Sequence, residues 1–453
     1  FTNLKKYQIH YSVLANGKTV KSGKVSLDIA PQASKEFTVP VNGLKARPGT
    51  EYFVNFSVIA VEPEPLIPAG YEIAYDQFRL PVEAERNTYK ANGPALQTQT
   101  QGDELTVSSS KVNFVFNKKS GLVTSYKVDG TEYFKDGFGI QPNFWRAPND
   151  NDYGNGAPKR LHVWKQSSKD FHVTDTKVST EDKAVLLQAT YLLAAGNLYV
   201  VTYKIYPSGI VHVNAKFTST DMQAAETEVS EATRMATFTP GSDAARKAAS
   251  KLEVPRIGVR FRLPAQMNNV QYFGRGPEEN YIDRNHGTMV GIYQTTADKM
   301  YFNYVRPQEN GHHTDTRWLN LSPDKGNGLV IVADSLIGFN ALRNSVEDFD
   351  SEEALPHPYQ WNNFSPEEAT NHDEKAARNV LRRMHHVNDI TPRDFVEVCV
   401  DMKQQGVGGY DSWGARPEPF HQIPANREYN WGVTLVPVRS GSQATEATKY
   451  DYR

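Results

Sequence analysis

The feature that most constrains the fold is an alternation of apolar and polar residues that recurs along most of the chain. Residues 7–13 show it near the start, and residues 111–116, 197–206 and 256–264 repeat it. Side chains two positions apart lie on the same face of a β-strand, so this period predicts half-buried strands. Most of these stretches end at Gly, Pro, Asn or Asp, which turns between strands favour. The pattern therefore predicts an all-β protein.

The length of the chain predicts more than one domain. Its 453 residues exceed the roughly 250 to 300 at which single hydrophobic cores stop growing. The strand patterns and a polar stretch near residue 90 divide the chain into four parts. These are an immunoglobulin-like β-sandwich over 1–88, a linker over 89–103, a large β-sandwich over 104–440, and a polar tail over 441–453 that we expect to fray.

Helical patterns are rare in this sequence. It contains no GxGxxG, no Walker loop and no βαβ rhythm. The best helix candidates are residues 243–251 and 365–384, and in the second Ser365 and Pro366 are placed as an N-cap and a first helical residue.

The charge balance excludes several classes of partner. Lys and Arg number 50 against 52 Asp and Glu, so the chain lacks the basic field that attracts nucleic acid or an anionic membrane. No apolar run approaches the roughly 20 residues of a spanning helix. The single cysteine, Cys399, lies in the alternation FVEVCV, and we interpret it as a buried small residue. Because the chain begins at Phe1 within a pattern, we expect a piece of a longer protein whose compartment the sequence does not determine.

The first candidate site is the stretch FWRAPNDNDYGNG at residues 144–156. Asp150, Asp152 and Gly154 have the alternate spacing of a calcium-binding loop, but Leu161 stands where that loop requires a bidentate Glu. We therefore interpret the stretch as an Asx-rich turn that caps its own backbone, with its two leading aromatic residues in the core.

The second stretch, YFGRGPEENYIDRNHG at residues 272–287, contains adjacent carboxylates at Glu278 and Glu279. Two carboxylates serve a retaining glycosidase only when they face each other across a sugar at roughly 5 Å. Neighbours on an extended chain point to opposite sides, so this pair cannot do so. We interpret the stretch as a shaped turn. We expect the turn to be held by hydrogen bonds from the side chains of Glu279, Asn280, Asp283 and Arg284.

The third stretch, VRPQENGHHTDTRWLNL at residues 305–321, places Glu309 near His312 and His313. These side chains suit a general base and acid at a carbonyl or hemiacetal carbon. The HHxD order also suggests a metal site, but no HExxH spacing or second cluster supports it. A loop with solvated histidines is the alternative that we prefer.

The fourth stretch is QGVGGYDSWGARPEP at residues 405–419. Its glycines predict a bend that presents Asp411 and Trp413 on a loop. An indole on a loop is a stacking platform for the apolar face of a pyranose ring. A core tryptophan that seals the sandwich is the equal alternative.

In this order, the four stretches resemble the C-terminal region of the β-galactosidases of glycoside hydrolase family two. RAPNDNDYG is similar to the family's RAPxDNDxG, FGRGPEENYIDR to its GxGPxENYxDR, VRPQENGHHTDTRWL to its PxENGxxxxxRxL region, and GGYDSWG to its GGDDSWG. The N-terminal segment containing LDIAPQ resembles the family's small sandwich, so the resemblance covers nearly the whole chain. It implies an immunoglobulin-like sandwich followed by a large galactose-mutarotase-like β-sandwich, also called a supersandwich.

The resemblance also implies an activity, which is the hydrolysis of terminal β-D-galactosides with retention. In that family the two catalytic glutamates, and most ligands of the divalent and monovalent metal ions, lie on a TIM barrel that precedes both domains. No (β/α)₈ alternation is present in this sequence. The resemblance therefore implies no catalytic residue, metal ligand or cofactor in this chain, which alone would be inactive. The implied partners are the barrel domain, a β-galactoside and further copies of the full-length chain, in a bacterial-type cytoplasm or periplasm.

The implied site residues belong to two loops. Trp413 matches an indole that stacks on sugar, and Asp411 would orient its loop, so both are assigned to substrate binding. The implied lid consists of Asn149, Asp150, Asn151, Asp152, Tyr153 and Gly154. The sequence departs from the family at Tyr410, where many relatives have an acidic residue, and in NGAPKR after Gly154.

Two other functions remain open at this point. The chain could be a non-catalytic carbohydrate-binding or assembly module, which predicts a folded but inert protein. On the implied fold it could also be a mutarotase-like aldose epimerase that acts through Glu309 with His312 or His313.

Overall fold

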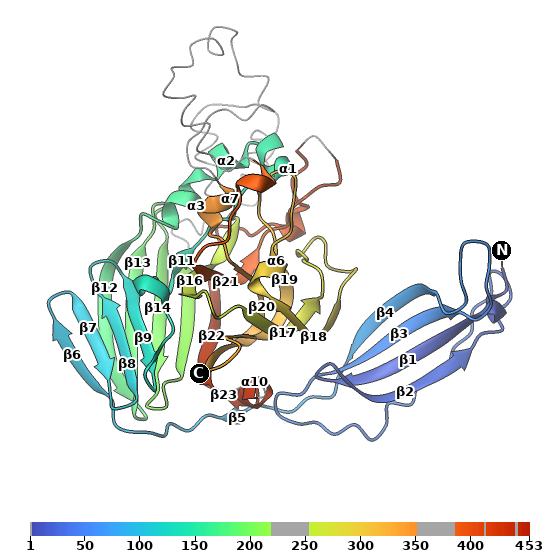
Figure 1. Ribbon diagram of the computed structural model, residues 1–453, viewed down its shortest axis with the longest axis horizontal. Helices are drawn as coiled ribbons and strands as arrows, with labels where there is room; N and C mark the ends of the chain where they lie inside the picture. The colour runs from blue at the N-terminus through green and yellow to red at the C-terminus, as the bar shows by residue number, and fades with distance from the viewer. Residues whose placement is uncertain (1, 219–252, 351–385, 412–413, 440–442) are drawn as a thin grey trace, which may run out of the picture.

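A computed structural model describes residues 2–218, 253–350, 386–411, 414–439 and 443–453. β-Strands dominate the described residues, so the all-β prediction is confirmed (Figure 1). The two predicted helices at 243–251 and 365–384, and Trp413, lie outside the described residues.

The N-terminal unit is one antiparallel sheet in the order β2-β1-β3-β4. Its strands are β1 Tyr7–Ala15, β2 Lys18–Ser26, β3 Tyr52–Ala60 and β4 Glu72–Leu80, preceded by a 3₁₀ turn at Leu4–Lys6. Asn16 (φ 44°) and Gly17 (φ 76°) connect β1 to β2. A two-residue hairpin of this kind requires positive φ at both positions, which Asn and Gly adopt more readily than other residues.

One face of this sheet is partly covered by a loop where a sandwich would have a second sheet. Within residues 27–51, all of which are described, no strand forms, and the β contact there is an isolated bridge from Pro48 to Ala84. The edge of the Phe37 ring contacts Phe56, with ring centroids 6.5 Å apart. Prolines at 31, 40 and 48 lack the N–H that a strand ladder needs, which explains the irregular backbone.

A five-stranded antiparallel sheet follows, in the order β10-β9-β8-β7-β6. Its strands are β6 Gln97–Gln101, β7 Glu104–Ser108, β8 Val112–Asn117, β9 Leu122–Val128 and β10 Thr131–Glu132. Strand β6 lies within the segment predicted to be a linker. Glu104 opposes Gln101 across a tight turn, so the polar sequence there forms a hairpin.

A twelve-stranded sheet forms the centre of the molecule, with the path β11-β16-β21-β20-β22-β15-β14-β13-β12 and a branch β20-β19-β17-β18. Its strands are β11 Gln141–Asn143, β12 His172–Glu181, β13 Ala184–Leu192, β14 Leu198–Ile205, β15 Val211–Thr218, β16 Arg256–Pro264, β17 Asn269–Gly276, β18 Met289–Thr296, β19 His313–Ser322, β20 Gly328–Leu342, β21 Phe395–Gln404 and β22 Tyr429–Val438.

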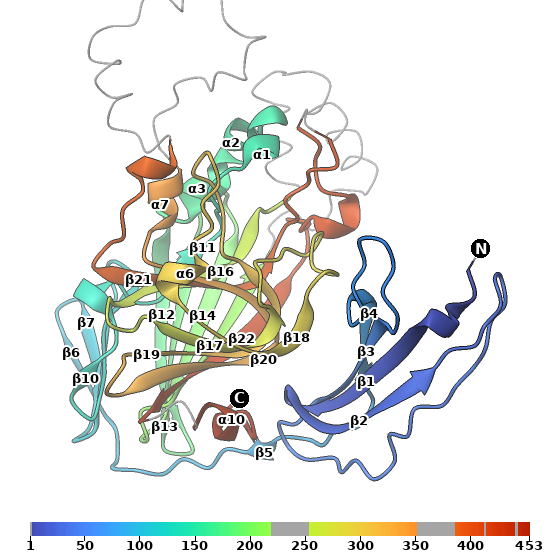
Figure 2. The same ribbon diagram turned by 45° about the vertical axis from the view of Figure 1, so that its right-hand side comes forward.

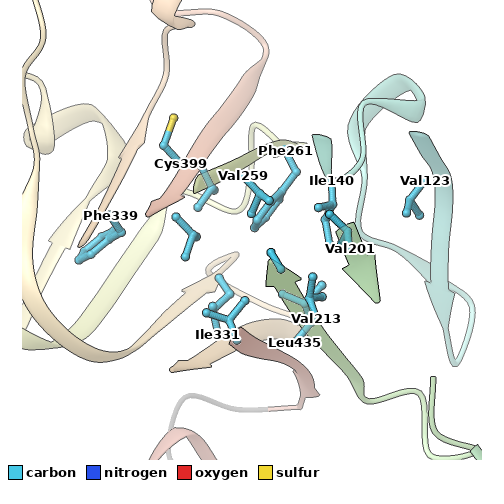
Figure 3. Close-up of a cluster of buried hydrophobic side chains, with 14 of the residues drawn as sticks. Val123, Ile140, Val201, Val213, Val259, Phe261, Ile331, Phe339, Cys399 and Leu435 are labelled. Carbon is cyan, nitrogen blue, oxygen red and sulfur yellow. The ribbon is translucent and has the colours of Figure 1, made fainter. Parts of the chain in front are cut away.

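The main core lies where the five-stranded sheet packs against the large sheet. Figure 3 shows apolar side chains from many strands meeting there, among them Val123 of β9, Val201 of β14 and Cys399 of β21. The Tyr126 hydroxyl donates to the backbone oxygen of Gly209 at 2.6 Å and joins the two layers. Cys399 is 3% exposed, so its predicted burial is confirmed.

The helices in the described ranges are short, and none is long and apolar enough to cross a membrane. The α-helices are α1 Asp150–Gly154, α2 Ala157–Arg160, α3 His162–Ser167, α6 Ala297–Met300, α7 Val346–Phe349 and α10 Ala444–Ala447. The remaining 3₁₀ turns are Lys135–Gly137, Val387–Asp389 and Pro419–His421. In both views α1, α2 and α3 lie together at one end of the molecule and α10 lies at the other (Figures 1 and 2).

The C-terminal segment is packed, which corrects the expectation that it frays. Strand β23 Tyr450–Asp451 pairs in parallel with β5 Asn87–Thr88. Tyr452 is 4% exposed, and its ring lies 4.9 Å from that of Tyr89. Buried alanine and tyrosine side chains among the polar residues supply enough apolar contact to hold the segment.

Candidate functional site

The four candidate stretches meet at the end of the large sheet where β21 stops. The backbone that follows β21, residues 405–409, lies at the centre of this region. In Figure 2 it runs beside α1, on the same end of the molecule. Side chains from residues 146–149 and 283 bind it directly.

Arg146 connects the first stretch to the fourth. Its guanidinium donates to the backbone oxygens of Gln405 at 2.7 Å and Gly406 at 3.1 Å. It also forms an ion pair with Asp152, with Nη2 3.0 and 3.1 Å from the two carboxylate oxygens. Arg146 is 2% exposed, and its planar fork of donors suits this shared role better than a lysine would.

Asn149 begins helix α1 and holds it to the same loop. Its side-chain oxygen accepts from the Asp152 amide at 2.8 Å, while Asp152 accepts from the Asn149 amide at 3.1 Å, which completes a capping box. The Asn149 amide group also donates to the backbone oxygen of Val407 at 3.0 Å. The self-capping prediction is confirmed, but residues 150–154 form a helix where we expected a turn.

Arg306 of the third stretch lies over the outer side of α1. It forms an ion pair with the exposed carboxylate of Asp150 at 2.8 Å. Its guanidinium lies 4.1 Å from the centre of the Tyr153 ring, a distance typical of a cation–π contact. The first and third stretches are therefore joined at the surface.

The second stretch is structural, as predicted. Asp283 accepts from the backbone amides of Val407 at 3.0 Å and Gly408 at 2.8 Å. Glu279 accepts from the Gly311 amide at 2.7 Å and from Arg284 at 2.9 Å. These carboxylates fix loops of the third and fourth stretches, because each binds backbone amides on a distant segment.

The fourth stretch packs against the first through its glycines. A Cβ on Gly414 would lie 2.4 Å from the carbonyl carbon of Gly154, and one on Gly409 would lie 3.3 Å from the side-chain nitrogen (Nδ2) of Asn151. The carboxylate of Asp411 accepts from the Ala415 amide at 3.1 Å and so shapes its own loop. Of the predicted site residues, Asp411 and residues 149–154 are thus brought together, and Trp413 lies outside the described residues.

A buried charged cluster lies beneath these loops. Arg256 of β16 binds Glu309 at 2.9 Å and Asp401 of β21 at 3.2 Å. Both Arg256 and Asp401 are 0% exposed. Burial raises the pKa of Asp401 to about 7, with Arg256 opposing and Glu309 adding to the shift. Burial likewise raises the pKa of Glu309, although the charges of Arg256 and Arg146 oppose the shift.

Sequence reasoning missed Arg256 and Asp401, although a signal for Asp401 exists. It is a charged residue at a buried position of a strand whose centre, from Val396 to Val400, is apolar except for Glu397. The two residues beside it on neighbouring strands are both glycine, Gly258 on β16 and Gly338 on β20. A Cβ on Gly258 would lie 2.2 Å from an Asp401 oxygen, so this glycine makes room for the carboxylate.

A family comparison decides the identity of this arrangement. The model for the β-galactosidase small chain matches residues 108–435, and the model for β-galactosidase domain 4 matches residues 1–81. The chain belongs to the β-galactosidase small-chain family. A β-galactosidase from Priestia megaterium is 31% identical over 97% of this chain, and one from Streptococcus thermophilus is 26% identical over 97%.

The chain spans 37% and 36% of the length of those two relatives. Among solved structures, galactose 1-epimerase from Lactobacillus acidophilus matches with a TM-score of 0.36 and 9% identity, covering 77% of this chain and 99% of that one.

His312 and His313 are buried, contrary to the preferred interpretation of a loop with solvated histidines. His312 is 1% exposed and stacks on Tyr281, with ring centroids 5.4 Å apart. Burial lowers its pKa well below the usual range, and the charge of Arg256 adds to this effect. His313 is 3% exposed, and its two ring nitrogens lie near the backbone oxygens of Gly311 and Pro277. The cavity beside Glu309 measures about 10 Å³, which is room for roughly one water molecule.

A second buried charged cluster lies between helix α2 and the end of the fourth stretch. Glu253 forms ion pairs with Arg160 of α2 and with Arg416, the latter at 2.7 Å. Burial lowers the pKa of Arg160 to about 9, and the neighbouring charge of Arg416 adds to the shift. The cluster ties helix α2 to the exit of the fourth stretch.

Apolar side chains project from the same loops. They are Phe302 (53% exposed), Val305 (88%), Tyr410 (73%) and Phe420 (71%). Within the described ranges, no group of three or more His, Cys, Asp or Glu is arranged to hold a metal ion. At this end of the molecule the loops are therefore built for shape and contact, and their charged side chains hold the backbone.

Proposed function

We propose that this chain is the C-terminal part of a β-galactosidase of glycoside hydrolase family two, which hydrolyses terminal β-D-galactosides with retention. The β-galactosidases that it matches are much longer, so the rest of such an enzyme has room for a TIM barrel. That part would supply the acid/base and nucleophile glutamates and the divalent and monovalent metal ions. In this proposal the chain itself contributes loops that line the active site.

The convergence of the four stretches carries this proposal. Arg146, Asn149 and Asp283 each bind the backbone of residues 405–408, and Gly414 packs on Gly154. A loop held by so many contacts can present a side chain at a defined position, as an enzyme needs for orienting a substrate.

We assign Trp413 and Asp411 to substrate binding within this loop. The indole would stack on the apolar face of galactose, and the Asp411 carboxylate would keep the loop in shape through its bond to the Ala415 amide. Residues 149–154 would form part of a lid over bound sugar. Gly154 at the end of α1 is exposed and adjoins Gly414, so a small shift of one segment requires a shift of the other.

The exposed apolar residues at this end favour a partner surface. Phe302, Val305 and Tyr410 lie on the same loops as the proposed lid contacts, where the barrel of the same enzyme would cover them. Further copies of the full-length chain are the other proposed partner.

The burial of Glu309 and His312 disfavours the epimerase alternative. Side chains that are 5% and 1% exposed and that adjoin an arginine cannot contact a sugar without rearrangement. A polarimetric assay of galactose mutarotation by this chain should therefore match buffer.

The test is complementation of activity. The chain alone is assayed with p-nitrophenyl β-D-galactoside, and again after mixing with a barrel-containing N-terminal fragment of a related enzyme. We expect no hydrolysis alone and hydrolysis on mixing, with p-nitrophenyl α-D-galactoside as the control substrate. Proton NMR of the first-formed sugar should show the β-anomer.

Three results would contradict the proposal. Hydrolysis by the chain alone would place catalytic groups within it. A folded complex with the barrel fragment that still lacked activity, or a Trp413→Ala complex with unchanged kcat and KM, would remove the assigned role of the loop.

A further inference from the structure

The branch of the large sheet formed by β18, β17 and β19 bears an in-register row of amide side chains. Gln294 of β18 opposes Gln271 of β17, and Gln271 opposes Asn320 of β19. Directly opposed residues point to the same face of a sheet, so the three amides form a row across the strands. In both views β18 lies at the edge of the sheet on the side of the β1–β4 unit (Figures 1 and 2).

A second polar row lies two residues further along the same strands. It consists of Thr296, Asn269 and Ser322, again in register. Strands lie about 4.8 Å apart and alternate residues about 6.8 Å apart, so the two rows span an area similar to that of one or two sugar rings. Five of these six side chains, together with Val270 and Thr295, line a cavity of about 430 Å³.

The amides of the first row are not used by the fold. Gln271, Gln294 and Asn320 make no side-chain hydrogen bond to any of the residues that the structure describes. Asn320 is 3% exposed, and its side-chain oxygen is buried without a partner. A buried polar atom in this state is costly, so native proteins seldom retain one without a water, ion or ligand to satisfy it.

The chemistry of the lining indicates the class of ligand. The cavity is lined by amides and hydroxyls without a charged side chain. An amide both donates and accepts, which matches a sugar hydroxyl that does the same, whereas an ionic ligand would need an opposite charge. A bound peptide strand would need apolar pockets for its side chains, and Val270 is the one apolar residue in the lining.

We propose that Gln271, Gln294 and Asn320 form a binding site for a neutral saccharide, separate from the loops described above. The amide row lies near the start of β17 at Asn269, whereas the loop of the second stretch, residues 277–287, follows the end of that strand at Gly276. The site therefore does not depend on the proposed hydrolytic function. It would hold carbohydrate against the β18 edge of the sheet.

The test is saturation-transfer NMR with the full chain and three disaccharides: lactose, cellobiose and maltose. We expect saturable binding of at least one of them. The double variant Gln271→Ala/Gln294→Ala should weaken it about tenfold or more, because two amide contacts are lost. Gln99→Ala, on the exposed face of β6, is the matched control and should leave it unchanged.

A milder variant separates binding from folding. Gln294 is exposed, so Gln294→Glu should leave the thermal unfolding midpoint unchanged while it replaces an amide donor by a carboxylate. Gln294→Glu should nevertheless weaken disaccharide binding. Trp413→Ala should not affect this binding.

Three outcomes would overturn the proposal. The first is that none of the three disaccharides binds. The second is that Trp413→Ala abolishes binding while the double variant retains it. The third is that the chain self-associates in analytical sedimentation and the double variant does not. The last would make the row an interface between copies.

Discussion

Gly414 lies so close to Gly154 that a Cβ added to it would stand 2.4 Å from the carbonyl carbon of Gly154. The two glycines belong to stretches far apart in the sequence, and their contact positions the Asp411 loop against helix α1. Backbone approaches backbone here without an intervening side chain, which only glycine permits. The proposed substrate loop and the proposed lid are therefore one packed unit.

Replacement of Gly414 by alanine should separate the loop from α1. The methyl group would contact backbone atoms that cannot rotate away, and the φ of 97° is unfavourable for any residue with a Cβ. We expect a loss of roughly 2 to 4 kcal/mol in the free energy of unfolding. Gly130→Ala is the matched control, because Gly130 also has positive φ (81°) but has nothing within 4 Å of its Cβ position. If urea unfolding showed the same loss of unfolding free energy for Gly414→Ala and Gly130→Ala, the contact between Gly414 and Gly154 would not be what stabilises the loop.

Asp283→Asn should loosen the backbone after β21. The carboxylate accepts from the amides of Val407 and Gly408, and the asparagine keeps one acceptor oxygen but loses the charge. We expect a loss of about 1 to 2 kcal/mol and faster hydrogen exchange at these two amides. Asp28→Asn, at an exposed carboxylate of the N-terminal unit, should change neither quantity. Unchanged exchange in Asp283→Asn would show that the loop is held by Arg146 and Asn149 alone.

Asp401 should make the folded state less stable as pH rises. Burial raises its pKa to about 7, above the value of about 3.9 in an unfolded chain, so the folded state binds this proton more tightly. The resulting stability is complete below about pH 4 and is lost as pH rises through about 7, by roughly 4 kcal/mol at most.

Asp401→Asn should remove that dependence, because asparagine does not ionise. His312, whose pKa burial lowers, acts in the opposite direction, with stability lost as pH falls. Its ring lies 3.8 Å from the Asp401 carboxylate, so the comparison is made above pH 7, where His312 is neutral in both proteins, as well as below it. Urea unfolding of both proteins across this pH range measures the difference. Parallel curves would mean that Asp401 is ionised throughout.

Gln77→Ala should uncouple the N-terminal unit from the large sheet. The Gln77 side chain donates to the backbone oxygen of Val290 at 2.9 Å and accepts from its amide at 2.8 Å. It therefore binds the backbone of β18 as a neighbouring strand would, and it links the two units. We expect a loss of about 1 to 2 kcal/mol, seen as earlier protease cleavage between residues 80 and 97. Gln99→Ala serves as the control. A cleavage rate equal to wild type would show that Arg317–Glu51 and Phe53–Phe273 suffice.

The position and face of most strands were predictable from the sequence. Alternation at residues 111–116 and 197–206 predicted β8 and β14, because the period of two is a local property of an extended backbone. The Asn16-Gly17 hairpin and the burial of Cys399 followed from equally local signals. The four stretches could be singled out one by one, since their unusual residues are adjacent in the chain.

The partners of those residues were decided by the tertiary structure alone. Arg256, Glu309 and Asp401 come from two strands and a loop. No local sequence pattern predicts that Arg256 forms ion pairs with both carboxylates. The packing of the C-terminal segment was likewise not predictable, because its sequence is mostly polar and its contact with Tyr89 is made by a segment far away in the chain. A sequence pattern reports which face of an element is apolar, because that is a matter of spacing. It does not report which distant segment covers that face, because side chains far apart in the chain acquire partners only when the sheets assemble.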